Sequence, residues 1–281
     1  MNLTKQAKDA FNKLISFFPF NDYIDVSVYY EILAILRELN KFVSDFEGKK
    51  LLDIGSGPMD KTAIFQFMGF QCYAVDDLSD PWHNRDSNIN LIKSFAKSTG
   101  INFFHQKDGD YTIPFDAQSF DVVCSLAVIE HLHESPRSLL NTMGNYLKVN
   151  GLLVVVMPNS VNLRKRLSVL IGRTNYVPVE QFFYSDGLWR GHVREYTLAE
   201  AEFICRQSGF EVVASRTFES LAQVKLKTPF RQLYLLMGSV LPTTRSSLLV
   251  VCRKPPTWMP VESDFAAFRK ACAGSVPKGV A

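Results

Sequence analysis

The feature that most constrains the fold is a series of seven short apolar runs that alternate with segments of helical periodicity after Gly48. Nearly every position in each run is apolar, which is typical of strands buried on both faces of a parallel sheet covered by helices. This alternation predicts a doubly wound α/β fold. The expected strands are 51–54, 72–75, 101–104, 122–126, 152–156, 210–213 and 248–251, with helices at 61–68, 88–97, 136–147 and 198–208.

Two more helices are expected ahead of this region, because apolar residues recur at helical spacing over residues 3–18 and again over residues 29–46. The tail after Pro255 has little periodicity, although residues 265–268 could form a short helix. These changes of pattern divide the chain into an N-terminal helical cap (1–47), a main α/β domain (48–254) and a flexible C-terminal tail (255–281).

Composition excludes several classes of protein. Of the 281 residues, 47% are hydrophobic and 21% are charged, which suits a globular core and argues against global disorder. A net charge of +3 is too small to indicate nucleic acid as a partner. The five cysteines form no Cys-x-x-Cys pair, the N-terminus lacks a secretory pattern, and no apolar run reaches the roughly 18 residues of a membrane span. We therefore expect a cytoplasmic protein.

A glycine-containing loop closes the first expected strand. In the segment Asp53-Ile54-Gly55-Ser56-Gly57-Pro58, the two glycines allow a tight turn and a close approach of the backbone to a ligand. In an open α/β sheet, ligands bind beyond the carboxyl ends of the strands, near the point where strand order reverses. The second expected strand ends at Asp76. An acid at that place can accept hydrogen bonds from two ribose hydroxyls.

The loop departs from the dinucleotide-binding pattern at its third glycine position, which is occupied by Asp60. A carboxylate there would repel a pyrophosphate, and it suits a ligand that carries a positive sulfonium and no phosphate. The alternative interpretation is a plain tight turn in which Asp60 caps the following helix.

Five segments, in family order, resemble the motifs of class I S-adenosylmethionine-dependent methyltransferases. They are the loop at 51–58, the acidic segment at 75–79, the segment 108–115, the fourth-strand region 119–132, and the turn at 147–152. This resemblance covers about residues 48–216. It implies a Rossmann-like fold, with a seven-stranded, mostly parallel sheet whose last strand is antiparallel, and it implies S-adenosylmethionine as the cofactor.

The resemblance also implies which residues contact the cofactor. The two loop glycines would pass under its methionine part, and Asp76 would bind the ribose. Asp108 and Gly109 would lie beside the adenine, with Asp110 as a competitor because the spacing after Asp108 is one residue long. The expected contacts are Asp53, Gly55, Ser56, Gly57, Asp76, Asp77, Asp108, Gly109 and Leu126.

A connection of about forty residues, 158–197, joins the fifth expected strand to the helix at 198–208, and connections of that length are usually functional. Its closing segment, Gly191-His192-Val193-Arg194-Glu195-Tyr196-Thr197, resembles insertions in methyltransferases of bacterial polysaccharide and glycolipid gene clusters. We expect a helical lid over an acceptor that is a small molecule, a sugar or a lipid-linked compound. The connection is rich in basic and aromatic residues: Arg164, Lys165, Arg166, Arg173, Phe182, Phe183, Tyr184 and Trp189.

Two histidines are the candidates for catalysis. An alcohol acceptor must lose its proton, and histidine is the commonest base. His131 follows the fourth expected strand and should face the cofactor, whereas His192 lies in the expected lid. For each of them, the alternative is a structural hydrogen bond that holds the loop, since some enzymes of this kind work mainly by alignment.

Glu130, His131 and His133 together raise the question of a metal site, because carboxylates and imidazoles suit divalent ions. Some relatives with a Glu-x-x-Glu-His pattern bind metal. Here the first glutamate position is Ala127, so the pattern is broken and we expect no metal.

Two segments, 162–172 and 230–241, mix basic and apolar residues. Helices of this composition can lie on a membrane surface, in which case the protein would be peripheral to the inner face of the membrane and the acceptor lipid-linked. The alternative is that both helices pack on the sheet with their arginines outward, as amphipathic helices of soluble proteins routinely do.

Three functions fit these observations. The first is O-methylation of a sugar, glycolipid or related small molecule, and the second is methylation of a phenolic acceptor in quinone or secondary metabolism. The third is a non-enzymatic binding domain of the same fold. A nucleic-acid acceptor is not expected, because the chain lacks both a strong basic excess and the Asn/Asp-Pro-Pro-Tyr/Phe signature.

Overall fold

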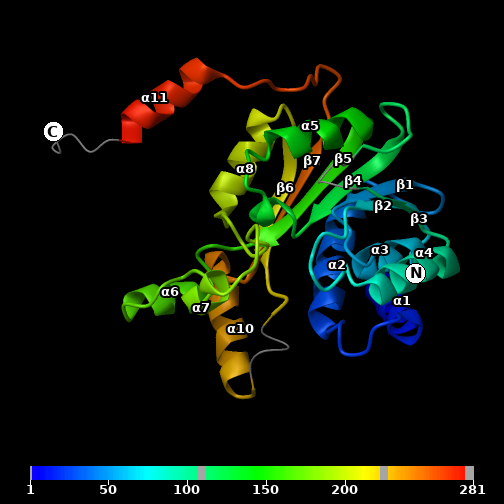
Figure 1. The fold of residues 1–281 in the computed structure, drawn as a ribbon, viewed down its shortest axis with the longest axis horizontal. Coiled ribbons are helices and arrows are strands. Elements are labelled where there is room, and N and C mark those ends of the chain that lie inside the picture. Colours follow the sequence, from blue (N-terminus) through cyan, green and yellow to red (C-terminus); the bar gives the residue numbers. More distant parts are fainter. Residues whose placement is uncertain (1, 107–111, 222–226, 276–281) are drawn as a thin grey trace.

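The computed structural model describes residues 2–106, 112–221 and 227–275. Its strands are β1 (Lys50–Ile54), β2 (Gln71–Asp76), β3 (Asn102–His105), β4 (Phe120–Leu126), β5 (Leu147–Pro158), β6 (Glu211–Phe218) and β7 (Ser247–Arg253). They form a single sheet in the order β3-β2-β1-β4-β5-β7-β6 (Figure 1). The first five strands pair in parallel, and β7 runs antiparallel to both β5 and β6. The expected sheet, with its antiparallel last strand, is confirmed.

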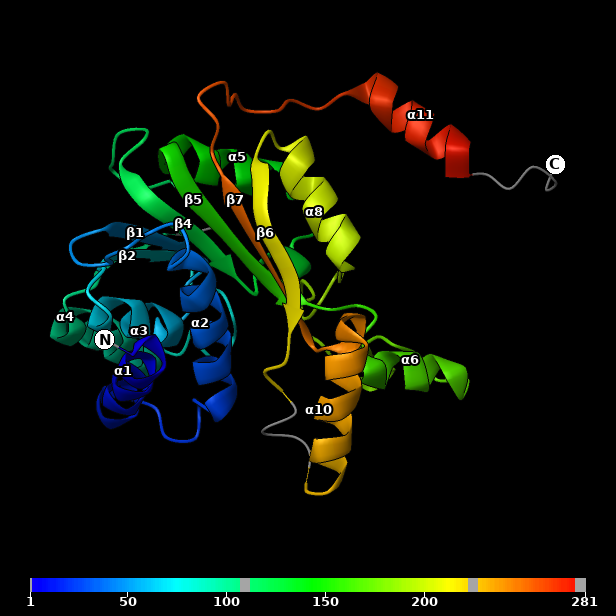
Figure 2. The same cartoon turned by 180° about the vertical axis from the view of Figure 1, so that it is seen from behind.

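Helices cover both faces of this sheet (Figures 1 and 2). One face carries α1 (Leu3–Phe17), α2 (Val26–Leu39), α3 (Asp60–Phe67) and α4 (Asp86–Thr99), and the other carries α5 (Arg137–Tyr146) and α8 (Leu198–Gln207). Successive strand residues feed opposite layers, so that Leu51 packs with the first layer and Leu52 with the second. Double-sided burial explains why the strands are continuous apolar runs.

The two N-terminal helices belong to the first layer. Leu14 of α1 and Ile35 of α2 are fully buried in the same hydrophobic cluster as strand residues. The second helix ends at Leu39, so the expectation that it continues to residue 46 is wrong. The chain turns after α2, and Phe46 stacks on Phe70 with ring centroids 4.8 Å apart. The apolar pattern beyond Leu39 therefore reflects packing of a turn against the start of β2.

The segment that follows β7 is anchored as far as Val261. The ammonium of Lys254 donates hydrogen bonds of 2.7 and 2.8 Å to two backbone carbonyls at the end of α5. The indole of Trp258 donates to a carbonyl just after α8 at 2.9 Å, and the Val261 N–H donates to Asn141 at 3.0 Å. The expectation of a flexible tail over residues 255–281 stays a prediction, and these contacts hold residues 255–261 against the body of the protein. Beyond them, α11 (Phe265–Ser275) extends away from the body (Figure 2).

Two insertions leave the carboxyl edge of the sheet and extend away from it (Figure 1). The first joins β5 to α8 and contains α6 (Leu163–Leu170) and α7 (Val179–Phe183), and its two ends meet where the Ser160 N–H donates to the Tyr196 carbonyl at 2.9 Å. The second joins β6 to β7 and contains α10 (Phe230–Val240) and the 3-10 turn η2 (Pro242–Thr244). Both views place α6 beside α10. The expected helical insertion after β5 is confirmed.

Candidate active site

A cavity of about 710 Å³ opens at the carboxyl ends of β1, β2 and β4. Strand order reverses between β1 and β4, so the cavity lies where open α/β sheets bind their ligands. It is lined by seven of the nine residues expected to contact a cofactor, namely Asp53, Gly55, Ser56, Gly57, Asp76, Asp77 and Leu126. The other two, Asp108 and Gly109, lie outside the described residues. The structure thus brings the expected residues together, and their contact with a cofactor stays a prediction.

The glycine loop depends on two residues with left-handed backbone. Gly55 has a φ of +77° and Gly57 a φ of +53°. A β-carbon on Gly55 would stand 2.5 Å from a methyl group of Val128, whereas one on Gly57 would stand 3.5 Å from its nearest neighbour, His83. Gly55 is therefore required both by its torsion angle and by lack of space, and Gly57 by its torsion angle alone.

Asp76 ends β2 and fixes this loop. One of its carboxylate oxygens accepts a hydrogen bond from the Gly57 N–H, the other accepts one from the Leu78 N–H, and both distances are 2.7 Å. Burial raises the pKa of Asp76, while these two N–H groups lower it. Each carboxylate oxygen can accept a second hydrogen bond. Asp76 can therefore hold the loop and bind two ribose hydroxyls at the same time.

Asp53 is a buried carboxylate at the end of β1, only 1% exposed. One oxygen accepts a hydrogen bond from the Thr62 hydroxyl at 2.6 Å. Among the described residues, the other oxygen has no partner beyond the weakly donating thiol of Cys124. Burial raises the pKa of Asp53 to about 6, opposed by the Thr62 hydrogen bond and by Lys61. A buried carboxylate oxygen without a strong donor, on a residue that lines the cavity, suits a cationic group of a ligand, such as an ammonium.

Asp60 occupies the third glycine position of the loop pattern, and it is buried and lines the cavity. It is the first residue of α3. Burial raises its pKa, whereas Lys61 and the backbone N–H groups of the first turn lower it. The carboxylate therefore occupies the helix N-terminus where a pyrophosphate would otherwise bind. This arrangement favours a cationic ligand. The alternative in which Asp60 caps the helix is wrong, because the N-cap is Met59 and no side chain among the described residues makes a cap hydrogen bond, although the carboxylate of Asp60 still lies favourably in the first turn of α3.

One wall of the cavity comes from the segment between α1 and α2, which sequence reasoning missed. Tyr23 stacks on Trp82 with ring centroids 4.9 Å apart, and its hydroxyl lies 3.4 Å from a ring nitrogen of His83. Tyr23, His83 and Lys61 all line the cavity, and Lys61 forms an ion pair of 2.7 Å with Glu31 of α2. These contacts join segments far apart in the chain. The only sequence signal for this wall was that Tyr23 is an aromatic residue in the short loop between two helices.

Three residues around the cavity have left-handed backbone although none of them is glycine. The φ angles of Met59, Leu78 and Ala127 are +63°, +48° and +63°. They lie in the connections that follow β1, β2 and β4, the three strands whose ends form the cavity. Each such conformation costs roughly 1–2 kcal/mol, and residues of this kind cluster at functional sites.

Two histidines after β4 fasten the first insertion to the body. His131 Nδ1 lies 2.8 Å from the carbonyl oxygen of Arg190, and His133 Nε2 lies 2.8 Å from that of Trp189. A carbonyl can only accept, so these nitrogens carry the proton and the opposite nitrogen of each neutral ring is an acceptor. His131 thus makes the structural hydrogen bond considered as its alternative role. It also lines the cavity, and its Nε2 keeps a free lone pair.

His192 belongs to the closing segment of the insertion, and its ring meets that of His131 edge to face with centroids 4.9 Å apart. Its Nδ1 is hydrogen-bonded to Glu195 at 2.7 Å, and Glu195 forms an ion pair with the buried Lys165 of α6. Burial, with His131 and Lys165 adding to its effect, lowers the pKa of His192 to about 4. The Glu195 carboxylate acts in the opposite direction, but Lys165 offsets its charge. The ring is therefore neutral at neutral pH.

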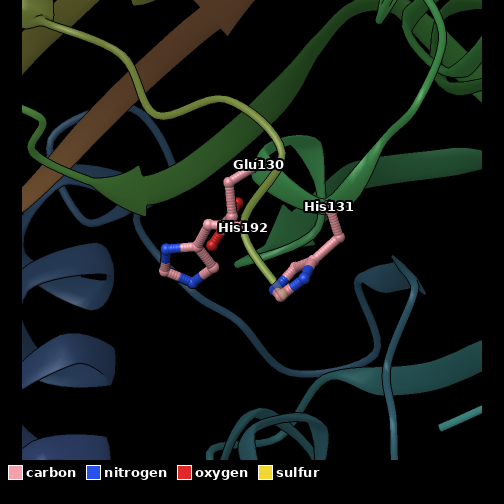
Figure 3. Close-up of side chains that lie close together, drawn as sticks. All are labelled: Glu130, His131 and His192. Carbon is pink, nitrogen blue, oxygen red and sulfur yellow. The ribbon is translucent and has the colours of Figure 1, made fainter. Parts of the chain in front are cut away.

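Glu130, His131 and His192 form one polar cluster beside the cavity (Figure 3). The oxygen and nitrogen atoms that they offer all lie within 4.8 Å of one another. Glu130 is 1% exposed, one of its oxygens has no hydrogen-bond partner among the described residues, and burial raises its pKa to about 7. These are the residues that could hold a divalent ion, with His192 in the place considered for His133. The expectation that no metal binds stays a prediction.

The fold and the cavity define a class of protein: a doubly wound α/β protein that binds a small, cationic nucleoside ligand at the switch point of its sheet. The chain belongs to the methyltransferase family, because the sequence profile described as "Methyltransferase domain" matches residues 28–215, more than half of its length. S-adenosylmethionine is the cofactor. The site fits it, since Asp53 has a buried oxygen that lacks a strong hydrogen-bond donor among the described residues and suits the ammonium group, Asp76 can bind the ribose, and Asp60 places negative charge where the cofactor carries no phosphate.

Curated relatives match part of the chain. A ubiquinone biosynthesis O-methyltransferase of Rickettsia felis is 24% identical over 163 residues, which cover 57% of this chain and 63% of that protein. A protein of the same name from Caulobacter vibrioides is 30% identical over 136 residues, covering 45% of this chain and 51% of its own. The chain thus spans about half to two thirds of the length of these relatives.

Solved structures support the fold. An S-adenosylmethionine-dependent methyltransferase from Mesorhizobium loti superposes with a TM-score of 0.53 and 17% identity, over 79% of this chain and 98% of that one. A SAM-dependent methyltransferase from Aquifex aeolicus gives a TM-score of 0.50 and 15% identity, over 86% and 97% of the two chains. Because these identities are low, the likeness concerns the fold and leaves the acceptor to be argued from the site.

Proposed function

We propose that this protein transfers the methyl group of S-adenosylmethionine to a hydroxyl oxygen of a sugar, a glycolipid or a related small molecule. The observation that carries the proposal is a pair of imidazoles in contact: His131, which lines the cofactor cavity, and His192, whose ring packs edge to face against it. In each ring Nδ1 is engaged by a hydrogen-bond acceptor, so Nε2 is left to take a proton. An alcohol is the kind of acceptor that needs a base of this type.

The geometry supports a simple division of labour. When bound, S-adenosylmethionine would supply a methyl group on a positively charged sulfur that can leave with the C–S electron pair as a neutral thioether. His131 Nε2 would take the proton of the acceptor hydroxyl whose oxygen becomes bonded to the methyl carbon. Leu188 and Arg190 of the insertion line the same cavity as Ala127 and His131. An acceptor held beneath the insertion is therefore next to the cofactor, where alignment lowers the barrier most.

Glu195 and Lys165 are proposed as positioning residues that act through His192. The carboxylate fixes the ring by its hydrogen bond to Nδ1, and the ammonium fixes the carboxylate. Burial lowers the pKa of Lys165 to about 8, so the ion pair is intact at neutral pH. His192 then keeps a neutral Nε2, which could orient the acceptor hydroxyl.

The names of the curated relatives favour a second candidate, a phenolic acceptor of quinone or secondary metabolism. A phenol has a pKa near 10 and ionises far more readily than an alcohol, so it depends less on a base. The size of the loss caused by removing His131 Nε2 therefore separates the two acceptors. A protein that binds the cofactor tightly and methylates nothing would correspond to the third function, a binding domain.

The experiment is transfer of a labelled methyl group from S-adenosylmethionine to a panel of nucleotide sugars, glycolipids and catechols. With the preferred acceptor in hand, His131→Asn is compared with His133→Gln, because the asparagine amide can replace the Nδ1 donor of His131 and the longer glutamine amide can replace the Nε2 donor of His133. We expect His131→Asn to lower turnover by roughly 10²–10⁴-fold with an alcohol, and His133→Gln by much less. Equal losses in the two variants would mean that His131 only holds the loop.

A further inference from the structure

The helices of the two insertions are apolar but bury almost nothing. In the described part of the chain, residues 163–188 and 230–241, here called the apolar arm, carry fifteen of the 26 exposed large hydrophobic side chains. No residue of α7 is buried, and the buried positions of α6 and α10 are Lys165 and Gly238. The fifteen are Leu167, Val169, Leu170, Ile171, Tyr176, Val179, Phe182, Phe183, Tyr184, Leu188, Phe230, Leu233, Leu236, Val240 and Leu241.

The two parts of the apolar arm meet at the rim of the sheet, although they are far apart in the sequence. Both views show α6 and α10 clear of the sheet, with α6 lying roughly crosswise to α10 near one end of that helix (Figures 1 and 2). Arg166 of α6 donates hydrogen bonds to Thr243 at the end of the second insertion, and Asn159 donates to the carbonyls of Thr243 and Arg245. The alternative in which these helices pack on the sheet and turn only arginines outward does not describe the arm. Its apolar side chains face solvent.

Positive charge accompanies these apolar side chains. The arm contains five basic residues and two acidic ones, Glu180 and Asp186. Within the described residues, none of Arg164, Arg173 and Arg231 takes part in a salt bridge. The charge of the arm is therefore available to a partner that is apolar at depth and anionic at its surface.

We propose that the apolar arm docks this protein on the surface of a membrane that contains anionic phospholipids. Helices with exposed aliphatic and aromatic side chains and surrounding basic residues bind in the plane of the membrane–water interface, where aromatic rings are enriched. Among the residues described, none of the helices has the length and apolarity needed to cross a bilayer. A two-fold contact between arms of two copies would instead set like charges against each other.

The arm also leaves the sheet at the edge where the cavity opens. Leu188, at the end of the arm, lines the cavity together with Arg190. A lipid-linked acceptor could therefore reach the cofactor without leaving the membrane. This last consequence rests on the proposed function, whereas the docking itself does not.

The test is flotation of the full chain with phosphatidylcholine vesicles, with and without phosphatidylglycerol, at low and high salt. We expect binding to the anionic vesicles that weakens with salt. Phe182→Ser with Phe183→Ser, and separately Leu233→Ser with Leu236→Ser, should each lower the vesicle-bound fraction roughly tenfold or more. The matched control is Phe265→Ser with Phe268→Ser on α11, whose rings are similarly exposed at 71% and 62%, and it should float like the wild type.

Two further measurements keep the proposal open to refutation. Arg164→Gln with Arg173→Gln should remove most of the preference for anionic over neutral vesicles. Wild-type protein that does not float with anionic vesicles, or arm variants that float as well as the α11 control, would overturn the proposal. So would a dimer, seen by sedimentation, that the arm variants dissociate while vesicles bind nothing. Flotation needs no acceptor or turnover, so failure of the proposed methylation would be a separate result.

Discussion

Two regions of the molecule use the same kinds of side chain in opposite ways. One is the apolar arm, and the other, here called the cofactor half, consists of β1, β2 and β4 with the loops that follow them. Around β1, β2 and β4, apolar residues are buried on both faces, and Leu51, Leu52 and Val123 are fully inaccessible. In the arm, side chains of the same kinds face solvent, since Leu170 is 79% and Phe183 is 74% exposed. Burial inside the chain explains the first set. The second set has no such explanation within the described residues, which is why a partner outside the chain is its natural complement.

The comparison also concerns polar groups. In the cofactor half, the carboxylates are buried and held by short hydrogen bonds to backbone or hydroxyl groups, as for Asp53 and Asp76. In the arm, Arg164, Arg173 and Arg231 have no carboxylate partner among the described residues. The polar groups of the cofactor half are therefore held in place before a ligand binds. These arginines of the arm are not held by carboxylates of the described residues, and a binding partner would supply their counter-charges.

The largest effect should come from the cofactor half, at the tightest point of its loop. Gly55→Ala combines a left-handed torsion with a β-carbon 2.5 Å from Val128, so we expect a loss of about 3 kcal/mol in the free energy of unfolding. Gly57→Ala has the torsion but not the clash and should cost about 1 kcal/mol. Urea unfolding of both variants measures the difference. Equal losses would show that the loop is less closely packed than described.

The second largest effect should come from loss of the Asp76 carboxylate, and it should appear in the affinity for S-adenosylmethionine. Asp76→Ala removes the acceptor of the Gly57 and Leu78 N–H groups as well as the expected ribose contact. We expect the affinity for S-adenosylmethionine to fall roughly a hundredfold, about 2.7 kcal/mol. Calorimetric titration measures this, and the variant Phe182→Ser with Phe183→Ser in the arm is the control that should bind normally. Unchanged affinity in Asp76→Ala would remove this residue from the cofactor site.

A smaller effect should follow from the protonation of Asp53. Its pKa in the folded protein is raised to about 6 by burial, so at pH 5 about nine tenths of the carboxyl groups are protonated and unable to accept an ammonium group as anions. Affinity for S-adenosylmethionine should therefore fall roughly tenfold between pH 7 and pH 5. Asp53→Asn should bind more weakly at pH 7 and lose this pH dependence. A wild-type affinity that does not change below pH 6 would contradict the assignment.

The same group makes a prediction for folding. Because the folded state holds the Asp53 proton more tightly than the unfolded state does, its contribution to stability declines as the pH rises from about 4 to about 6 and is constant above that. Comparison of urea midpoints for wild type and Asp53→Asn over this range isolates the contribution. A wild-type curve that is parallel to that of the variant would refute it.

The smallest effect should be found in the arm. Leu170→Ser and Phe183→Ser change side chains that are mostly exposed in the isolated chain, so each should alter the free energy of unfolding by less than about 0.5 kcal/mol. The same substitutions at buried positions of the cofactor half, such as Leu52→Ser, should cost several times more. Thermal melting of the two groups compares the halves directly. A marked loss from Leu170→Ser would mean that the arm packs on the rest of the chain.

Sequence reasoning was most successful where chemistry is local. Gly55, Gly57 and Asp76 follow on apolar runs and Asp53 lies near the end of one, so the strand pattern alone places them at one edge of the sheet. The prediction of a helix that reaches residue 46 was wrong because a non-local contact decides the structure there. Phe46, the last apolar residue of the pattern, packs on Phe70 of another segment.

Other parts of the site depend on contacts that no local pattern records. Tyr23 reaches the cavity by stacking on Trp82, which is 59 positions away, and Lys165 reaches Glu195 only because the insertion folds back on itself. Both pairs consist of common residue types in unremarkable surroundings. His131 and His192 were each suspected separately, but their edge-to-face contact and their shared neighbour Glu130 came from the folded arrangement.

The closure of the first insertion has an evolutionary consequence. Its ends, Ser160 and Tyr196, are joined by a backbone hydrogen bond at the rim of the sheet. The polypeptide between them is therefore attached to the sheet at two adjacent points. Such a segment can be lengthened, shortened or replaced without moving the strands that carry Asp53 and Asp76. Descendants of one ancestral catalyst could thus change what they methylate, or the surface on which they work, while inheriting the cofactor machinery intact.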